Sequence, residues 1–131
     1  MANGYQSREI APEPRSGRNA TGSSIAKGTI LVWASAAQET IAPASNATGP
    51  YAGVAGETIA NGNWGRVIVN GTCQVIFAAA QTIGARVTSN ASGQAAAAAS
   101  GNAVLGIARE AGGTGVLAEV ELAGPGGQAM P

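Results

Sequence analysis

Short apolar runs, bounded by glycine, asparagine and proline, fill the chain between residues 25 and 124. The run GTILVWAS (Gly28–Ser35) is rich in β-branched residues, which is typical of a buried or half-buried strand. In GVLAEVELA, near the end, apolar and polar residues alternate. The apolar set is Val116, Ala118, Val120 and Leu122, with Glu119 and Glu121 between them. A period of two predicts a strand with one face toward a core and the other toward water.

The same signals predict further strands in TIAPAS, YAGVA, GARVTSN and AVLGIA. Pro43 lies in the first of these and argues against a central strand there, because proline has no N–H to donate. The stretch QAAAAAS (Gln94–Ser100) could be a helix, since alanine has the highest helix propensity. It spans about two turns and has no amphipathic face, so a small-residue strand or a close-packed loop is the alternative.

The dipeptide Asn70-Gly71 lies between WGRVIV and TCQVIFAA and is the strongest short hairpin signal in the chain. We expect a two-residue hairpin in which Val69 opposes Thr72. One face of this hairpin would point inward, with Arg66 near its edge. That face consists of Trp64, Ile68, Cys73, Val75 and Phe77.

Two segments repeat each other without a gap: GVAGETIANGNWGRVIVNG (Gly53–Gly71) and GIAREAGGTGVLAEVELAG (Gly106–Gly124). Three glycines (Gly53, Gly62 and Gly71 with Gly106, Gly115 and Gly124), the glutamates Glu57 and Glu110, and several apolar residues coincide. The agreement indicates two related half-units of about 50 residues, or coincidence in a chain rich in glycine and alanine. One sheet cannot bury its apolar face alone, so we expect an all-β fold, a small β-barrel or β-sandwich.

The ends of the chain lack any hydrophobic period. Residues 1–24 hold Pro12, Pro14 and several Gly, Ser and Asn, which predicts an extended N-terminal arm. Residues 125–131 (PGGQAMP) predict a flexible C-terminal tail, which leaves residues 25–124 as a β-rich core domain.

The composition narrows the classes of partner. Seven Lys and Arg balance seven acidic residues and are scattered, whereas nucleic-acid binding needs cations gathered on one face. Charged residues make up 11%, against about 25% on average, so the surface suits a protein covered by neighbours. No apolar run approaches the ~18 residues of a membrane span, and the first residues lack the basic-then-apolar pattern of a signal peptide. We therefore expect a soluble, unsecreted protein with neither nucleic acid nor membrane as a partner.

The sequence offers little material for catalysis. It has no His and no Asp, so we expect no catalytic site, no metal site and no cofactor. Glu57 and Glu110 are expected to cap turns or form salt bridges rather than to act as a carboxylate pair. The glycine-rich EAGGTG lacks the Lys-Ser/Thr of a phosphate loop and is expected to be a hairpin turn. Cys73, a single cysteine within the predicted strand TCQVIFAA, is expected to be a buried, unreactive thiol.

The order GVAGETIANGNWGRVIVNGTCQVIFAAA, IGARVTSNASGQAAAAASGNAVLGIARE and GGTGVLAEVELAG resembles the capsid decoration, or cement, proteins of tailed bacteriophages. The resemblance covers roughly residues 50–124. Here the turns carry Gly or Asn, where the family usually has acidic residues.

This resemblance implies a non-enzymatic virion protein, made in the bacterial host cytoplasm, that stabilises the outer surface of an assembled capsid. Its partners would be the major capsid protein and itself, as a homo-oligomer, with a trimer favoured over a dimer. The arm would contact the capsid or a neighbouring subunit. The arm residues expected to do so are Tyr5, Arg8, Ile10, Pro12, Pro14, Arg15 and Arg18.

Two other functions fit the same residues. The first is another virion structural role, such as a head-fibre base, a tail component or a minor capsid protein. The second is a small-ligand or carbohydrate-binding β module, for which Trp33 and Trp64 are the candidates for the floor of a site.

Overall fold

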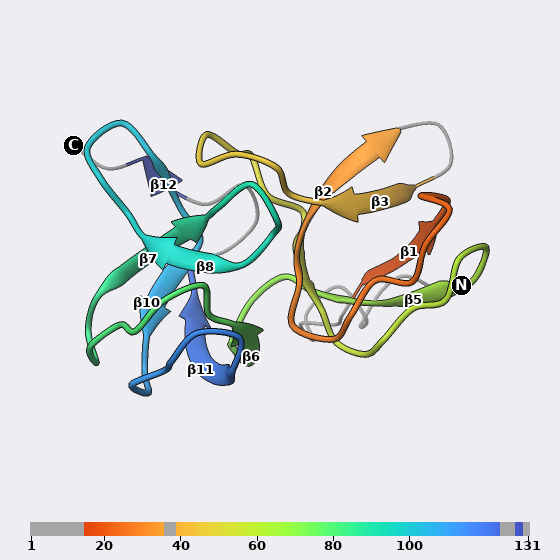
Figure 1. The fold of residues 1–131 in the computed structure, drawn as a ribbon. Coiled ribbons are helices and arrows are strands. Elements are labelled where there is room, and N and C mark those ends of the chain that lie inside the picture. The colour runs from red at the N-terminus through yellow and green to blue at the C-terminus, as the bar shows by residue number, and fades with distance from the viewer. Residues whose placement is uncertain (1–14, 36–38, 124–127, 130–131) are drawn as a thin grey trace, which may run out of the picture.

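The computed structural model describes residues 15–35, 39–123 and 128–129, and these residues form strands and turns without a helix (Figure 1). The expected all-β fold is confirmed. Within the described residues, no helix could therefore cross a membrane. The strands are β1 (Arg15–Asn19), β2 (Ile30–Ser35), β3 (Thr40–Pro43), β4 (Gly53–Ala55), β5 (Trp64–Ile68), β6 (Thr72–Ile76), β7 (Arg86–Ser89), β8 (Ala95–Ala97), β9 (Ala103–Val104), β10 (Gly106–Ala108), β11 (Leu117–Leu122) and β12 (Gln128–Ala129).

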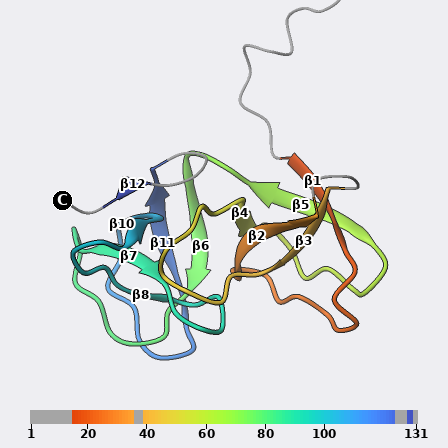
Figure 2. The ribbon, with the colours of Figure 1, turned by 90° about the horizontal axis from the view of Figure 1, so that it is seen from above.

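Two lobes lie side by side in both ribbon views (Figures 1 and 2). Lobe 1 is a closed barrel of β1 to β5 in the order β1-β3-β2-β4-β5, in which β5 returns to pair with β1. Lobe 2 is a five-stranded sheet in the order β6-β11-β10-β7-β8. A small sheet of β9 and β12 adjoins lobe 2.

The two lobes have the same topology. Strands β1 to β5 of lobe 1 correspond in order to β6, β7, β8, β10 and β11 of lobe 2, and the pairing partners correspond as well. The parallel pairing of β1 with β3 includes Asn19 and Ile41, and lobe 2 keeps its counterpart as a parallel bridge between Phe77 and Ala95. Lobe 2 is thus a copy of the barrel with a nearly open edge between β6 and β8.

The sequence repeat matches this duplication in register. The pairs of β4 with β5 and of β10 with β11 fall on positions 53 residues apart. They are Val54–Ile68 with Ile107–Glu121, and Ala55–Val67 with Ala108–Val120. The two copies are therefore equivalent structural units. This supports the interpretation of the repeat as two related half-units rather than as coincidence.

The first strand corrects the expected arm of residues 1–24. Arg15–Asn19 forms β1, which pairs with both β3 and β5 and closes the barrel of lobe 1. Gly17 supplies the reason: its missing side chain leaves room for Ile41 and Val67. A segment without a hydrophobic period can therefore still line a barrel.

The expected hairpin at Asn70-Gly71 is wrong. Strand β5 pairs with β1 and β4, whereas β6 pairs with β11, so this turn carries the chain from one lobe to the other. Gly71 has φ +81°, as the tight turn requires, but the strands on either side diverge. The expected inward face splits accordingly: Val75 and Phe77 are buried, Ile68 and Cys73 are half-buried, and Trp64 is 56% exposed.

The expectation that Pro43 keeps its segment from being a central strand is also wrong. Strand β3 lies between β1 and β2, and Pro43 is tolerated because it ends the strand beyond Thr40 and Ile41, the residues that pair with β1. Two other strand expectations fared better. The alanine run forms β8, paired with β7, which decides the open choice in favour of a strand. In β11 the alternation holds, with Ala118 and Val120 buried and both glutamates exposed, while Val116 precedes the strand and is 53% exposed.

Two apolar clusters hold the molecule together. One fills the barrel of lobe 1 and consists of Ile25, Leu31, Ile41, Ala52, Ala55, Ile59 and Val67. The other fills lobe 2 and continues without a break into the outer face of β2 and β4. Its members from lobe 1 are Ile30, Ala44, Tyr51 and Val54. The lobes therefore share a core, because apolar residues of lobe 1 complete the burial of lobe 2.

Equivalent positions inside the lobes carry side chains of opposite size. In lobe 1, Ile59 is large and packs where Gly65 leaves space. In lobe 2 the equivalent of Ile59 is Gly112, and Phe77 occupies the space from the opposite wall. Lobe 1 has a buried asparagine at the position of Phe77: Asn19, whose amide donates to the carbonyls of Ser23 and Ile59 at 2.7 and 2.8 Å.

Candidate functional site

The junction between the lobes is built from backbone hydrogen bonds at the edge between β6 and β8. The N–H of Ile76 donates to the carbonyl of Gly28 at 2.9 Å, and the N–H of Ile30 donates to that of Gly93 at 2.8 Å. Gly28 has φ +88°, and a side chain there would collide with Leu117. Lobe 1 thus covers the edge at which lobe 2 fails to close.

A buried tyrosine links the lobes a second time. The hydroxyl of Tyr51 lies 2.8 Å from Oγ1 of Thr88, accepts the N–H of Ser89 at 3.2 Å, and lies 3.2 Å from the carbonyl of Asn46. Buried hydroxyls need such partners, because an unpaired one costs free energy on leaving water. The polar contacts of Tyr51 therefore fix the angle at which the two lobes meet.

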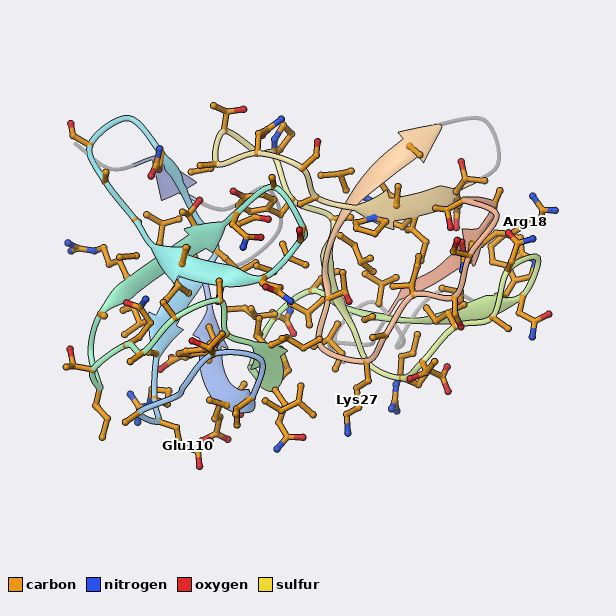
Figure 3. All side chains as sticks on the ribbon, in the orientation of Figure 1. Arg18, Lys27 and Glu110 are labelled. Atoms are coloured by element: carbon orange, nitrogen blue, oxygen red, sulfur yellow. The ribbon has the colours of Figure 1, made fainter. Side chains whose placement is uncertain are left out.

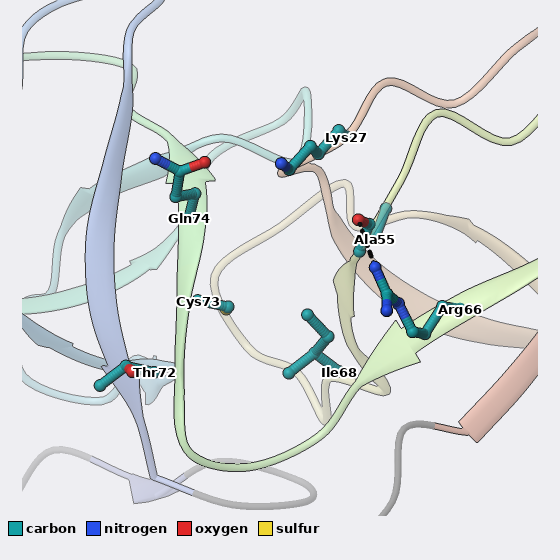
Figure 4. Close-up of a pocket in the computed structure, with 8 residues that line it drawn as sticks. Lys27, Ala55, Arg66, Ile68, Thr72, Cys73 and Gln74 are labelled. Atoms are coloured by element: carbon teal, nitrogen blue, oxygen red, sulfur yellow. Dashed lines mark hydrogen bonds between the residues drawn. The ribbon is translucent and has the colours of Figure 1, made fainter.

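A small hollow of about 170 Å³ opens where the lobes meet (Figure 4). Lys27 and Arg66 come from lobe 1, and Thr72, Cys73 and Gln74 come from β6. Arg66 donates through Nη2 to the carbonyl of Gly56 at 3.3 Å, which holds the guanidinium at the rim. The described lining contains two cations and no carboxylate, so its chemistry suits contact with an acidic group.

Cys73 lines this hollow and is half-buried. Burial, with a smaller contribution from the nearby Glu119 carboxylate, raises the pKa of the Cys73 thiol to about 12. The thiol is therefore protonated at neutral pH and is a poor nucleophile. This agrees with the unreactive thiol expected from the sequence.

The two repeated glutamates do the same structural work in each lobe. Glu57 accepts the backbone N–H of Arg66 at 3.1 Å, and Glu110 accepts that of Glu119 at 2.8 Å. The two bonds occupy equivalent positions in the two lobes. The carboxylates therefore cap turns, as expected from the sequence, and do not face each other as a pair. An exposed ion pair, Arg109 with Glu121 at 3.2 Å, lies on the outer side of lobe 2.

The residues expected to contact a capsid are mostly beyond the structure. Tyr5, Arg8, Ile10, Pro12 and Pro14 lie outside the described residues. Arg15 and Arg18 belong to β1 of the barrel rather than to an arm. Arg18 is half-buried and lies at the end of lobe 1 that points away from lobe 2 (Figure 3).

The two tryptophans lie outside the hollows that the described residues line. Trp64 and Trp33 are 56% and 37% exposed, and neither lines the hollow at the junction or a second one beside Ile107. Among the described residues, no three His, Cys, Asp or Glu come together as metal ligands would. The duplication was the useful signal in the sequence. No signal in the sequence showed that Arg15–Asn19 corresponds to β6 of lobe 2, because no residue is the same at the equivalent positions of the two strands.

No protein-family model and no curated protein matches this sequence. Among solved structures, the chain is similar to the head fiber gp8.5 N base of bacteriophage phi29. The TM-score is 0.67 at 21% sequence identity, and the match covers 84% of this chain and 92% of that one. The likeness shows that the two proteins share a fold across almost the whole of the base.

Proposed function

We propose that this protein is a non-enzymatic structural component of a tailed-bacteriophage virion, and that it forms the base of a fibre on the head. The observation that carries the proposal is the shared fold, which spans 92% of the phi29 head fiber base. That protein is described as part of the head, and a fold kept over nearly its full length supports a similar place for this chain.

The polar and ionisable groups described above support a mechanical role. Tyr51 bonds across the junction, Glu57 and Glu110 bond to the backbone of their own lobes, and Cys73 is held protonated. A core shared between two lobes makes a rigid platform, because neither lobe can move without exposing apolar surface. Rigidity of this kind suits a base that holds a projecting part on a shell.

Capsid decoration is the second candidate, and the resemblance of residues 50–124 to cement proteins favours it. Both roles place the chain on the outer surface of a capsid, with the major capsid protein and further copies of itself as partners. They differ in consequence: a cement protein strengthens the shell, whereas a fibre base carries a projection.

The test compares virions with and without the protein. Phage particles carrying a stop codon early in the gene are purified, and their heads are reconstructed by electron microscopy. For a fibre base, the mutant heads lose a projection and its foot, and the temperature at which heads open stays unchanged. A lower opening temperature would favour decoration instead. Mutant heads that look and behave like the wild type would contradict both roles.

A second experiment tests the N-terminal residues as the capsid contact. Mutant heads are mixed with purified full-length protein or with a variant lacking residues 1–14, which keeps β1. Loss of binding with an unchanged circular dichroism spectrum would support a contact through Tyr5, Arg8, Ile10, Pro12 and Pro14. Equal binding by both proteins would place the contact on the lobes.

A further inference from the structure

The outer face of β7 and β10 in lobe 2, here the β7–β10 face, is the copy of a surface that is buried in lobe 1. Arg86 of β7 and Ile107 of β10 correspond to Ile30 and Val54, and Glu121 of the adjoining strand β11 corresponds to Ile68. In lobe 1 the first two of these counterparts are 0% exposed, because lobe 2 covers them. In lobe 2, Ile107 is 40% exposed and borders an open hollow of about 280 Å³.

At the internal junction a surface of lobe 2 covers the counterpart of this face, and lobe 1 has an equivalent copy of that covering surface. At the internal junction, lobe 2 offers the edge between β6 and β8 with Ile76, Gly93 and Leu117. The equivalent edge of lobe 1, here the β1–β3 edge, carries Arg18, Glu39 and Trp64. It lies at the far end of lobe 1, and Trp64 is 56% exposed there (Figure 3).

We propose that a second copy of this chain docks head to tail, with its β1–β3 edge against the β7–β10 face of the first. Equivalent positions of the internal junction would then meet between molecules, through side chains and without its backbone hydrogen bonds. The proposed function already names further copies as partners. This proposal adds the two surfaces that meet, and it rests on the duplicated fold rather than on the virion role.

The internal junction predicts which residues meet. Ile30 bonds to Gly93 there, so Arg86 would face Glu39 of the second copy, a cation opposite a carboxylate. Both side chains are exposed, and neither makes an ion pair within the described part of one chain. Leu117 lies against Gly28, so Trp64 of the second copy would lie over Gly84. This glycine has φ +92°, and the space that a side chain there would fill is open among the described residues.

The contact between copies lacks the backbone hydrogen bonds of the internal one. In lobe 1 the N–H of Arg18 donates to the carbonyl of Glu39 at 2.9 Å, so those backbone groups are already paired. Docking therefore relies on Trp64, Ile107 and the charges, which makes it reversible and dependent on concentration. A head-to-tail contact joins different surfaces, so it closes into a ring or grows into a filament.

The mass of the full-length protein in solution tests this contact. Sedimentation equilibrium over a range of concentrations should show species larger than the monomer. Ile107→Arg should weaken association about tenfold or more, whereas the control Val116→Arg, at an exposed turn outside the face, should not. A native protein that stays monomeric at the highest concentration, or association equally weakened by both variants, would overturn the proposal.

Exchanging the charges of Glu39 and Arg86 tests the head-to-tail orientation of the two copies. Both side chains are exposed, so the substitutions leave the core unchanged. Glu39→Arg and Arg86→Glu each place like charges opposite one another and should weaken association. The double variant restores opposite charges and should regain most of the lost affinity. If the double variant associates no better than the weaker single one, these residues do not meet and the head-to-tail arrangement is wrong.

Discussion

The burial of the Cys73 side chain depends on how the two lobes meet. Its thiol lies on β6 beside the cationic hollow, where it is shielded by the strands of both lobes. The sequence predicted an unreactive thiol from the apolar residues around it. The pairing that buries it was not predictable, because β6 lies beside β11 rather than beside the strand before it.

The raised pKa of Cys73 predicts a pH dependence of stability. Folding raises this pKa from 9.0 to about 12, so the protonated thiol favours the folded state. The contribution is complete below pH 9 and is lost as the pH rises toward 12. The difference in free energy of unfolding between the wild type and Cys73→Ala should therefore change across this interval. Denaturant titrations at several pH values would measure it, and a difference that is constant with pH would contradict the assignment.

At the scale of elements, local signals located the strands and missed their partners. The runs that become β2, β7 and β11 are apolar or alternating, and a pattern of that kind is local information. Asn70-Gly71 was misread because a positive φ is required at a lobe crossing as much as in a hairpin. Strand β1 escaped detection because its inward positions are Gly17 and Asn19, which are small or polar. The junction follows from packing across the lobes, which no short stretch encodes.

The closure of the barrel by β1 makes a deletion test possible. Removing residues 1–24 takes away β1 and exposes the edges of β3 and β5, so the variant should lose cooperative thermal unfolding. Removing residues 1–14 leaves β1 in place and should keep a sharp transition. Circular dichroism melting curves of both variants would measure this. A cooperative transition in the larger deletion would show that β1 is dispensable.

For the whole molecule, the shared core means that the lobes should unfold together. Lobe 2 depends on Ile30 and Val54 from lobe 1 for part of its burial, and Tyr51 bonds across the junction. If one lobe unfolded alone, this apolar surface would be exposed, and the hydrogen bonds between the Tyr51 hydroxyl and its partners would be lost.

Tyr51→Phe tests this coupling. The substitution removes the hydroxyl that accepts the N–H of Ser89 and contacts Thr88, which should lower the free energy of unfolding by about 1–3 kcal/mol. Differential scanning calorimetry should show one transition in both proteins, at a lower temperature in the variant. Thr48→Ala, on the exposed loop next to Asn46, serves as a control with little expected effect. Two resolved transitions in the wild type would show that the lobes are independent.

The opposite sizes of the side chains inside the two barrels bear on how a duplicated chain reaches its fold. Equivalent strands in the same register could pair with the wrong copy while the chain collapses, since their backbone hydrogen-bonding groups are alike. Ile59 and Phe77 prevent this outcome, because each needs the small partner of its own barrel, Gly65 or Gly112. An exchanged strand would bring two bulky side chains together in one barrel and two small ones in the other. The interior thus gives each half its own identity, and strand exchange between the copies is penalised by a clash in one and a void in the other.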